Sequence, residues 1–381
     1  MKYRIQLLFW LVALSCYAEA QAQTGNAKKT TGTPLSAYHP IAIRLDSARK
    51  DLSEADARLF SRFEVIDERP DTTRIGIHTS AYMNMYSHTR QLIFDRPASR
   101  EIAGYLNTHF AQPGAPYTAL VILRTLWLSD PNYIREDLVR DPDRRFEKTL
   151  IRLKAEIYAV KDGLYTPILR FDSLQVSLKA NLTQFGYDLT GMLNDLADSA
   201  SLLTTQKEGR SRQISLDQIR LFNQSRFNTA ITSDSTRTRG VYSSFEEFRN
   251  NAPSVLEYEI KKDKGNILLY VKEAGGNSYY SRNAWGYCDG KDIYVMKNGM
   301  LHAAWREGNA FYLFDDARVD QYPSSGSAPS DPAARIGGPV LGSGAGVAGA
   351  AALAATSRIN MAGSDTHRRV FTVDMDSGEI Y

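Results

Sequence analysis

The chain has 381 residues, with 46 lysines and arginines against 43 aspartates and glutamates. Its hydrophobic share of 43% and charged share of 23% are those of a folded globular protein, which excludes disorder along the whole chain. A net charge of +3 gives no basic surface for nucleic acid, and two cysteines exclude a disulfide-rich scaffold and a zinc site built from cysteines. At roughly 150 residues per domain, the length predicts two domains and a remainder.

Residues 1–20 have the features of a secretory signal peptide. Two basic residues precede an apolar run at 5–17, which is shorter than the roughly twenty residues that span a bilayer. A small-x-small pattern ends at Ala20, so cleavage is expected there, with Ala22 as the alternative. This pattern predicts secretion to the periplasm or cell envelope. Residues 21–39 are polar and lack apolar periodicity, which predicts a flexible leader.

Cys16 allows a second interpretation of the same segment. Ala13-Leu14-Ser15-Cys16 loosely resembles a bacterial lipobox, in which Cys16 would carry lipid. The apolar run continues past Cys16 to the site at Ala20, which favours ordinary cleavage. Cys288 then has no second cysteine in the mature chain, and we expect it to be buried and inert.

Residues 40–230 have the patterning of an α+β domain. Residues 120–128 carry apolar side chains at both odd and even positions, which is typical of a central strand buried on both faces. Residues 151–159 alternate apolar and polar side chains before Asp162-Gly163, which predicts a half-buried strand and a hairpin turn. Residues 189–203 carry apolar side chains at helical spacing. These elements predict a mixed sheet with two or more packing helices rather than a doubly wound sheet.

The start of this domain carries a short motif. A helix is predicted from Ser53, with Phe60 and Phe63 on its apolar face, and a strand over 63–67. This strand ends in Asp67-Glu68-Arg69-Pro70. With the order strand, helix, strand, hairpin, helix, the motif resembles small periplasmic α+β domains of auxiliary and assembly lipoproteins. That resemblance implies a non-enzymatic domain that binds a partner.

The turn signals and apolar stretches of residues 240–322 predict an antiparallel β-meander after a polar linker. Ser244 and Glu247 have the spacing of a helix cap, and one strand is expected from Tyr279 to Cys288. Four turn signals favour tight hairpins. They are Gly275-Gly276-Asn277, Asp289-Gly290, Asn298-Gly299 and Gly308-Asn309.

Two stretches of this region are distinctive: GVYSSFEEFRNNAPS at residues 240–254 and AWGYCDGKDIY at residues 284–294. They resemble uncharacterised secreted proteins of Bacteroidetes, which supports secretion and implies no activity. The meander is also rich in aromatic residues. Tyr279, Trp285 and Trp305 are candidates for stacking against a sugar, a nucleobase or a peptide side chain. The alternative is that the rings fill the core, since a small sheet has few other ways to bury apolar area.

The C-terminal part contains an unusual uncharged segment. A Pro/Ser-rich linker at 323–335 leads to residues 336–357, which carry no charge and are dominated by glycine and alanine, and residues 358–381 end the chain with a strand and tail. Small residues recur every four positions, a spacing that lets a second helix approach closely. They are Gly338, Gly342, Gly346 and Ala350. Three interpretations remain open: a membrane-associated glycine-zipper helix, a flexible excursion, and a buried soluble helix.

No motif for catalysis or cofactor binding stands out in the sequence. HExxH is missing, no GxGxxG or P-loop accompanies the α+β region, and the one Gly-Ser-Gly lies in the Gly/Ala segment without a strand–turn–helix context. We therefore assign no catalytic residue, metal or cofactor. We expect a non-enzymatic secreted envelope protein with a binding or assembly role, whose partner is an envelope protein or a glycan, with membrane contact or self-association through residues 336–357. The alternative is an envelope hydrolase or glycan-binding protein that uses the aromatic sheet.

Overall fold

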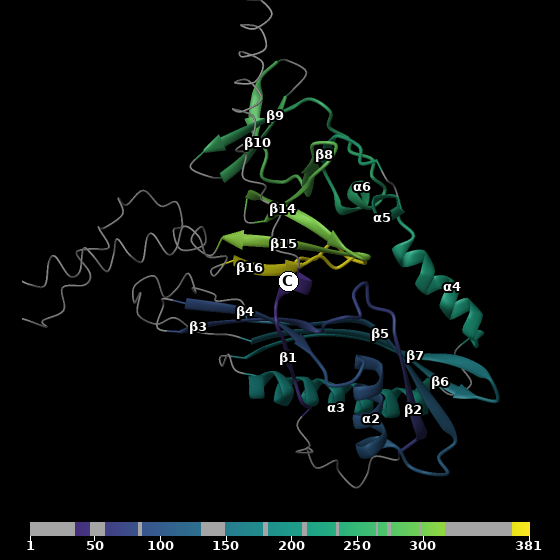
Figure 1. Ribbon diagram of the computed structural model, residues 1–381. Coiled ribbons are helices and arrows are strands. Elements are labelled where there is room, and N and C mark those ends of the chain that lie inside the picture. Colours follow the sequence, from purple (N-terminus) through teal and green to yellow (C-terminus); the bar gives the residue numbers. More distant parts are fainter. Residues whose placement is uncertain are drawn as a thin grey trace, which may run out of the picture. The chain divides into compact units, whose positions relative to one another are not determined.

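The computed structural model describes eleven stretches of the chain, drawn in colour in Figure 1. They are residues 35–45, 58–82, 86–130, 149–177, 182–207, 212–233, 236–263, 266–272, 276–297, 299–316 and 368–381. Every described element belongs to one compact unit, Thr33–Tyr381. The fold is mixed α+β, as the sequence predicts.

A seven-stranded mixed sheet forms the first part of this unit. Its path is β1-β4-β3-β5-β6-β7, with β2 paired to β5 beside β3. The β1/β4, β2/β5 and β3/β5 pairs are parallel, and the others are antiparallel. The strands are β1 (Pro40–Ala42), β2 (Phe60–Asp67), β3 (Gly76–Tyr82), β4 (Tyr86–Ile93), β5 (Tyr117–Ser129), β6 (Thr149–Lys161) and β7 (Leu164–Ser177).

The central strand of this sheet is β5, which is buried from Ala119 onward, as the nearly continuous apolar run at 120–128 predicts. The predicted helix that includes Phe60 and Phe63 is wrong, because both residues lie in β2. The two rings belong to the main core, and the parallel pairing with β5 overrides their helical spacing. Where β3 meets β5, a Cβ on Gly76 would lie 2.0 Å from the Leu128 carbonyl oxygen, so only glycine fits there.

Helices α2 (Ala98–Phe110) and α3 (Leu182–Lys207) cover one face of the seven-stranded sheet (Figure 1). The amphipathic pattern at 189–203 falls within α3, and its apolar residues pack in the same core as Ile102 and Leu106 of α2. This core also takes Leu123, Leu126 and Leu128 from β5. The opposite face of the sheet is therefore the one that remains for other contacts.

A β-bulge in β5 determines what that opposite face presents. The pairing with β6 shifts between Leu123 and Thr125. Leu123 and Leu126 both lie in the helix-side core, so Arg124 and Thr125 are left together on the other face, followed by Trp127. A bulge of this kind re-aims side chains without ending the strand.

The second part of the unit contains two antiparallel sheets. One has six strands in the order β16-β15-β14-β13-β12-β8, and the other has three in the order β11-β10-β9. The strands are β8 (Gly240–Tyr242), β9 (Tyr258–Asp263), β10 (Asn266–Lys272), β11 (Ser278–Tyr280), β12 (Gly286–Cys288), β13 (Ile293–Lys297), β14 (Met300–Glu307), β15 (Ala310–Asp316) and β16 (Arg368–Thr372).

The single strand predicted from Tyr279 to Cys288 is wrong. It is two strands in different sheets: β11 pairs with β10, whereas β12 pairs with β13 and β8. Trp285 lies between them and packs against the Phe248 ring with centroids 4.2 Å apart, which draws the chain from one sheet to the other. Cys288 is fully buried, as predicted.

Short helices connect and cap these sheets. They are the 3₁₀ turn η1 (Leu35–Ala37), α4 (Leu216–Phe227), α5 (Ala230–Ser233) and α6 (Phe245–Arg249). The predicted cap is confirmed at α6, where the Ser244 side chain accepts a hydrogen bond from the Glu247 N–H at 3.2 Å. Helix α4 starts with a capping box made by Ser215 and Gln218.

The seven-stranded and six-stranded sheets meet in a mixed cluster of buried residues. Trp127 of β5 lies 5.7 Å from Tyr312 of β15, centroid to centroid. Val370 of β16 and Tyr381 pack in the same cluster. After β16 the chain turns back on itself, so that Thr372 and Tyr381 exchange backbone hydrogen bonds. The C-terminal segment, residues 372–381, therefore forms part of the contact between the two sheets.

Candidate functional site

A cavity of about 40 Å³ lies where the seven-stranded sheet, the six-stranded sheet and α4 meet. Its walls come from the connection between β2 and β3, the bulged part of β5, α4, β15 and the C-terminal segment. The charged and aromatic residues that line it are Arg69, Asp71, Arg74, Arg124, Trp127, Arg226, Tyr312, Asp374 and Tyr381. Four arginines therefore line one cavity.

Arg69 anchors the base of the site. Its Nε and Nη2 donate to the two carboxylate oxygens of Asp67 at 2.8 and 2.7 Å, a bidentate pair that is almost fully buried. Its Nη1 donates to the Arg74 carbonyl oxygen at 2.7 Å. Arg69 therefore holds the end of β2 and the loop before β3 in one arrangement.

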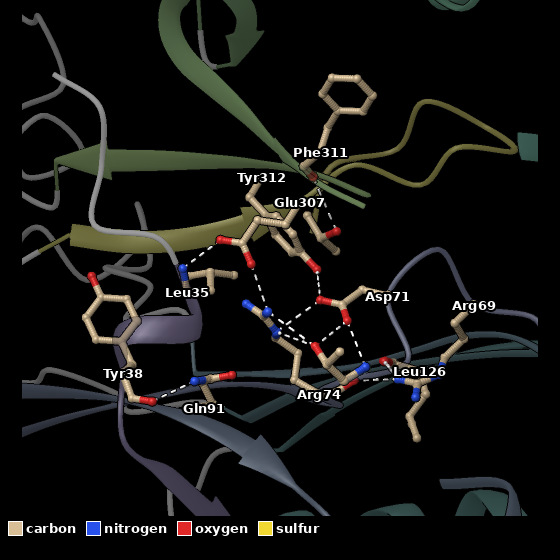
Figure 2. Close-up of polar contacts among 12 residues, drawn as sticks. Leu35, Tyr38, Arg69, Asp71, Arg74, Gln91, Leu126, Glu307, Phe311 and Tyr312 are labelled. Carbon is tan, nitrogen blue, oxygen red and sulfur yellow. Dashed lines mark hydrogen bonds and ion pairs between the residues drawn. The ribbon is translucent and has the colours of Figure 1, made fainter. Parts of the chain in front are cut away.

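Arg74 connects this loop to the six-stranded sheet (Figure 2). Its Nε lies 3.0 Å from Asp71 Oδ2, and its Nη2 donates to Glu307 Oε2 at 2.8 Å. The same Asp71 oxygen accepts the Tyr312 hydroxyl at 2.6 Å, and Glu307 Oε1 accepts the Leu35 N–H at 2.7 Å. Residues more than 200 positions apart thus share one buried network.

Arg124 and Arg226 form the wall on the α4 side. Arg124 Nη2 donates to Glu156 Oε2 at 2.6 Å, and its guanidinium carbon lies 5.3 Å from the centre of the Phe222 ring in α4. Arg226 forms a bidentate pair with Asp376 of the C-terminal segment, with Nε to Oδ1 at 2.7 Å. Each arginine is therefore held on its outer side by one carboxylate.

Asp374 closes the cavity from the C-terminal segment. Its Oδ2 accepts a hydrogen bond from Lys154 Nζ of β6, and its Oδ1 accepts the Asp376 N–H at 2.8 Å. A second link between the same strand and the segment joins Arg152 Nη2 to Glu379 Oε2 at 2.8 Å. These ion pairs attach the C-terminal segment to the first sheet as well as to its own.

Several buried donors at the cavity have no hydrogen-bond partner in the structure. They are Arg74 Nη1, Arg124 Nε and Nη1, Trp127 Nε1 and Arg226 Nη1. Each of the four side chains is more than nine-tenths buried. An unsatisfied buried donor costs about 1–3 kcal/mol, and more when it is charged, so five of them in one place are unfavourable without an occupant.

Burial also changes the acidity of the tyrosines at the site. The pKa of Tyr312 is raised well above 10, mainly because the ring is buried and also because the Asp71 carboxylate faces its hydroxyl. The pKa of Tyr381 is raised for the same reasons, with Asp374 as the neighbouring carboxylate. Both hydroxyls therefore stay protonated in the folded protein where an unfolded tyrosine, with a pKa near 10, would ionise.

This difference predicts a loss of stability at alkaline pH. A folded pKa above the unfolded value gives stability that is complete below about pH 10 and is lost as the pH rises further. We expect Tyr312→Phe to reduce the slope of unfolding free energy against pH, above pH 10, by up to about 1.4 kcal/mol per pH unit. Urea unfolding between pH 8 and 11 measures this slope. Tyr279→Phe, at a residue that is 49% exposed, is the control and is expected to leave the slope unchanged; equal slopes for Tyr312→Phe and the parent would contradict the prediction.

The structure places the three predicted stacking residues in separate surroundings. Tyr279 is half exposed on β11, in the three-stranded sheet. Trp285 is partly buried against Phe248, and Trp305 on β14 lies 5.6 Å from Tyr312, centroid to centroid. The Trp305 Nε1 donates to Glu307 at 3.0 Å, so this ring borders the ion network. The three rings do not form one platform.

The remaining predicted sites lie outside the described residues. These are the cleavage site at Ala20, the lipidation site at Cys16, and the row of Gly338, Gly342, Gly346 and Ala350. In the part of the chain that the structure describes, no helix has the length and apolar character needed to cross a membrane. No three His, Cys, Asp or Glu side chains of that part come together in a way that could hold a metal ion.

The sequence carries little sign that the cavity residues form a site. One signal is Arg124, the single charge within the apolar run of β5, because a buried arginine requires a partner. Asp67 and Arg69 belong to a short motif that predicts no cavity. The contributions of Arg226, Tyr312 and Asp374 had no local signal, because they depend on contacts between distant segments.

Comparison with known proteins does not assign the chain to a family. No protein-family model matches the chain, and no curated protein matches it.

Proposed function

We propose that this protein is a non-enzymatic, secreted protein of a bacterial envelope that binds a small polar ligand in the cavity between its two larger sheets. Secretion is supported by the signal-peptide pattern at residues 1–20. In this proposal, the N-terminal mixed sheet with α2 and α3 forms one wall of the ligand site. The antiparallel meander, closed by the C-terminal segment, forms the other.

The observation that carries the proposal is the set of five buried, unpartnered nitrogens at the cavity. An ion network that only joined two sheets would gain most by pairing every donor within the protein, because a half-satisfied buried network is less stable than an apolar contact. Here Arg74, Arg124 and Arg226 each pair with a carboxylate and each retain at least one nitrogen without a partner, whereas Arg69 is fully paired. This arrangement is what a ligand site needs, because the ligand supplies the missing acceptors.

The proposal is tested by ligand-induced thermal stabilisation of the purified chain. A panel of inorganic anions, small carboxylates, neutral sugars and polyamines is compared between the parent and Trp127→Phe, which removes one unpartnered N–H and keeps an aromatic ring. Trp285→Phe is the matched control, because Trp285 does not line the cavity. We expect at least one class to raise the Tm of the parent and of the control by about 2 °C or more at saturation, and to raise that of Trp127→Phe by less. No stabilisation by any class, or equal stabilisation of all three proteins, would show that the cavity is not a ligand site.

A further inference from the structure

We infer that the ligand of this cavity is a tetrahedral oxyanion, a phosphate or sulfate group, either free or at the end of a larger molecule. This inference rests on the proposed function and adds the chemical class of the ligand. Three features of the cavity lead to it: the kind of unpartnered atom, the charge of the walls, and the number of donors relative to the space.

The first feature is that every unpartnered side-chain atom among the described cavity residues is a nitrogen that only donates. Arginine and the indole N–H have no acceptor capacity in proteins. A ligand that completes this site must therefore offer acceptors. A metal ion or an ammonium group needs acceptors, and the unpartnered atoms offer none. We therefore do not expect a cation as the occupant.

The second feature is the charge of the walls. Four arginines and two aspartates line the cavity. Both aspartates are already engaged: Asp71 by Arg74 and the Tyr312 hydroxyl, and Asp374 by Lys154. The carboxylates that pair with Arg69, Arg124 and Arg226 do not line the cavity. Among the lining residues, positive charges therefore outnumber negative charges by four to two, and an anion can form strong charge-assisted hydrogen bonds with the unpartnered arginine nitrogens in this region of low dielectric.

The third feature is the match between donors and space. The five unpartnered nitrogens belong to lining residues of three segments: the loop before β3, the strand β5, and α4. A carboxylate has two oxygens and about four acceptor positions, fewer than the donors present, whereas a tetrahedral oxyanion offers oxygens in every direction. The cavity of about 40 Å³ is larger than the roughly 10–15 Å³ that one buried water needs and far below the roughly 300–1,000 Å³ of sites for drug-sized molecules. This space suits a small anionic group, so we expect any larger part of the ligand to lie outside it.

The β-bulge in β5 allows this strand to contribute side chains to the cavity. Without the extra residue, the alternation of β5 would place Arg124 or Thr125 toward the apolar helix-side core. With the bulge, both Arg124 and Trp127 line the cavity. Arg74 and Arg226 then complete the donor set from two other segments.

The experiment is isothermal titration of the purified full chain with sodium phosphate, sodium sulfate, sodium acetate and sodium chloride at equal ionic strength. Phosphate or sulfate is expected to bind, and acetate and chloride at least tenfold more weakly. Arg124→Lys, which keeps a positive charge and loses the donor fork, and Trp127→Phe are each expected to weaken phosphate binding by about tenfold. Trp285→Phe is expected to bind like the parent. Glycerol 3-phosphate is the further titrant: tighter binding than inorganic phosphate indicates a phosphate ester, and weaker binding indicates the free anion.

The outcomes separate the two proposals. Binding of acetate or of a neutral compound that Trp127→Phe weakens, without binding of phosphate or sulfate, would overturn the oxyanion and leave a ligand site. Phosphate binding that is equal in all four proteins would place the anion elsewhere on the surface and overturn the inference. The absence of any variant-sensitive binding, across these salts and the wider panel, would overturn both proposals. Circular dichroism of each variant confirms that a loss of binding does not come from unfolding.

Discussion

Replacement of Arg69 with methionine is expected to lower the free energy of unfolding by about 3–5 kcal/mol. The Arg69 side chain is 3% exposed and that of its partner Asp67 is 11% exposed, so the substitution leaves a carboxylate in a nearly dry environment without its counter-ion. The Arg74 carbonyl oxygen also loses the N–H that it accepts. Methionine preserves much of the side-chain volume, so the loss reports on charge and hydrogen bonding rather than on a cavity. Urea unfolding at pH 7 measures it.

Arg62→Met is the matched control for this experiment. Arg62 lies on β2, the strand that ends at Asp67, and forms an ion pair with Glu64 at 3.5 Å, but the two side chains are 68% and 48% exposed. Exposed pairs contribute about 0–1 kcal/mol, so the control is expected to change stability by less than 1 kcal/mol. Similar losses for Arg69→Met and Arg62→Met would show that the buried pair has no special role in holding the end of β2.

The second large effect is expected at Asp374, whose replacement with alanine should cost about 3 kcal/mol of unfolding free energy. This carboxylate is 2% exposed and joins the C-terminal segment to Lys154 of β6. Without it, Lys154 retains only the half-exposed carboxylates of Glu379 at 3.5 Å and Asp172 at 3.9 Å. We also expect faster amide hydrogen exchange at residues 372–381, because the segment loses its deepest attachment to the first sheet.

A double-mutant cycle separates the pair from the loss of one partner. Lys154→Met combined with Asp374→Ala removes both charges, and the double variant is expected to be more stable than Asp374→Ala alone, because no unpaired ammonium remains. Asp172→Ala, at a side chain that is 53% exposed, is the control and should change stability by less than about 1 kcal/mol. Additive losses in the cycle, or unchanged hydrogen exchange at the C-terminal segment, would argue against a role of the Lys154–Asp374 pair in holding this segment to the first sheet.

Local structure could be predicted from the sequence wherever it depends on the residues of one segment alone. The central strand β5, the helix α3 and the Ser244 cap are all confirmed. The Asp162-Gly163 turn is confirmed as well, with φ values of 53° and 75° that few residue types adopt. Each of these features depends on the periodicity or conformational preference of neighbouring residues, which is why no knowledge of the rest of the chain was needed.

Two local patterns were overridden by partners elsewhere in the chain. Phe60 and Phe63 have helical spacing, but β5 offers an unpaired edge and a core that takes both rings in a strand. The stretch from Tyr279 to Cys288 looks like one strand, but Tyr280 pairs with Tyr270 while Trp285 packs on Phe248. In both cases the decision rests on surfaces that form only after distant segments meet.

Composition excluded broad classes of protein, and the sequence by itself determined the central strand β5, the helix α3, the Ser244 cap and the burial of Cys288. Only the tertiary structure decided the cavity, because Arg74, Arg124, Arg226 and Asp374 come from four separate segments and face one space. A near-neutral total charge does not reveal this arrangement, since each arginine is balanced by a carboxylate. Apolar periodicity encodes which face of an element is buried, whereas the convergence of charges depends on which faces pack together.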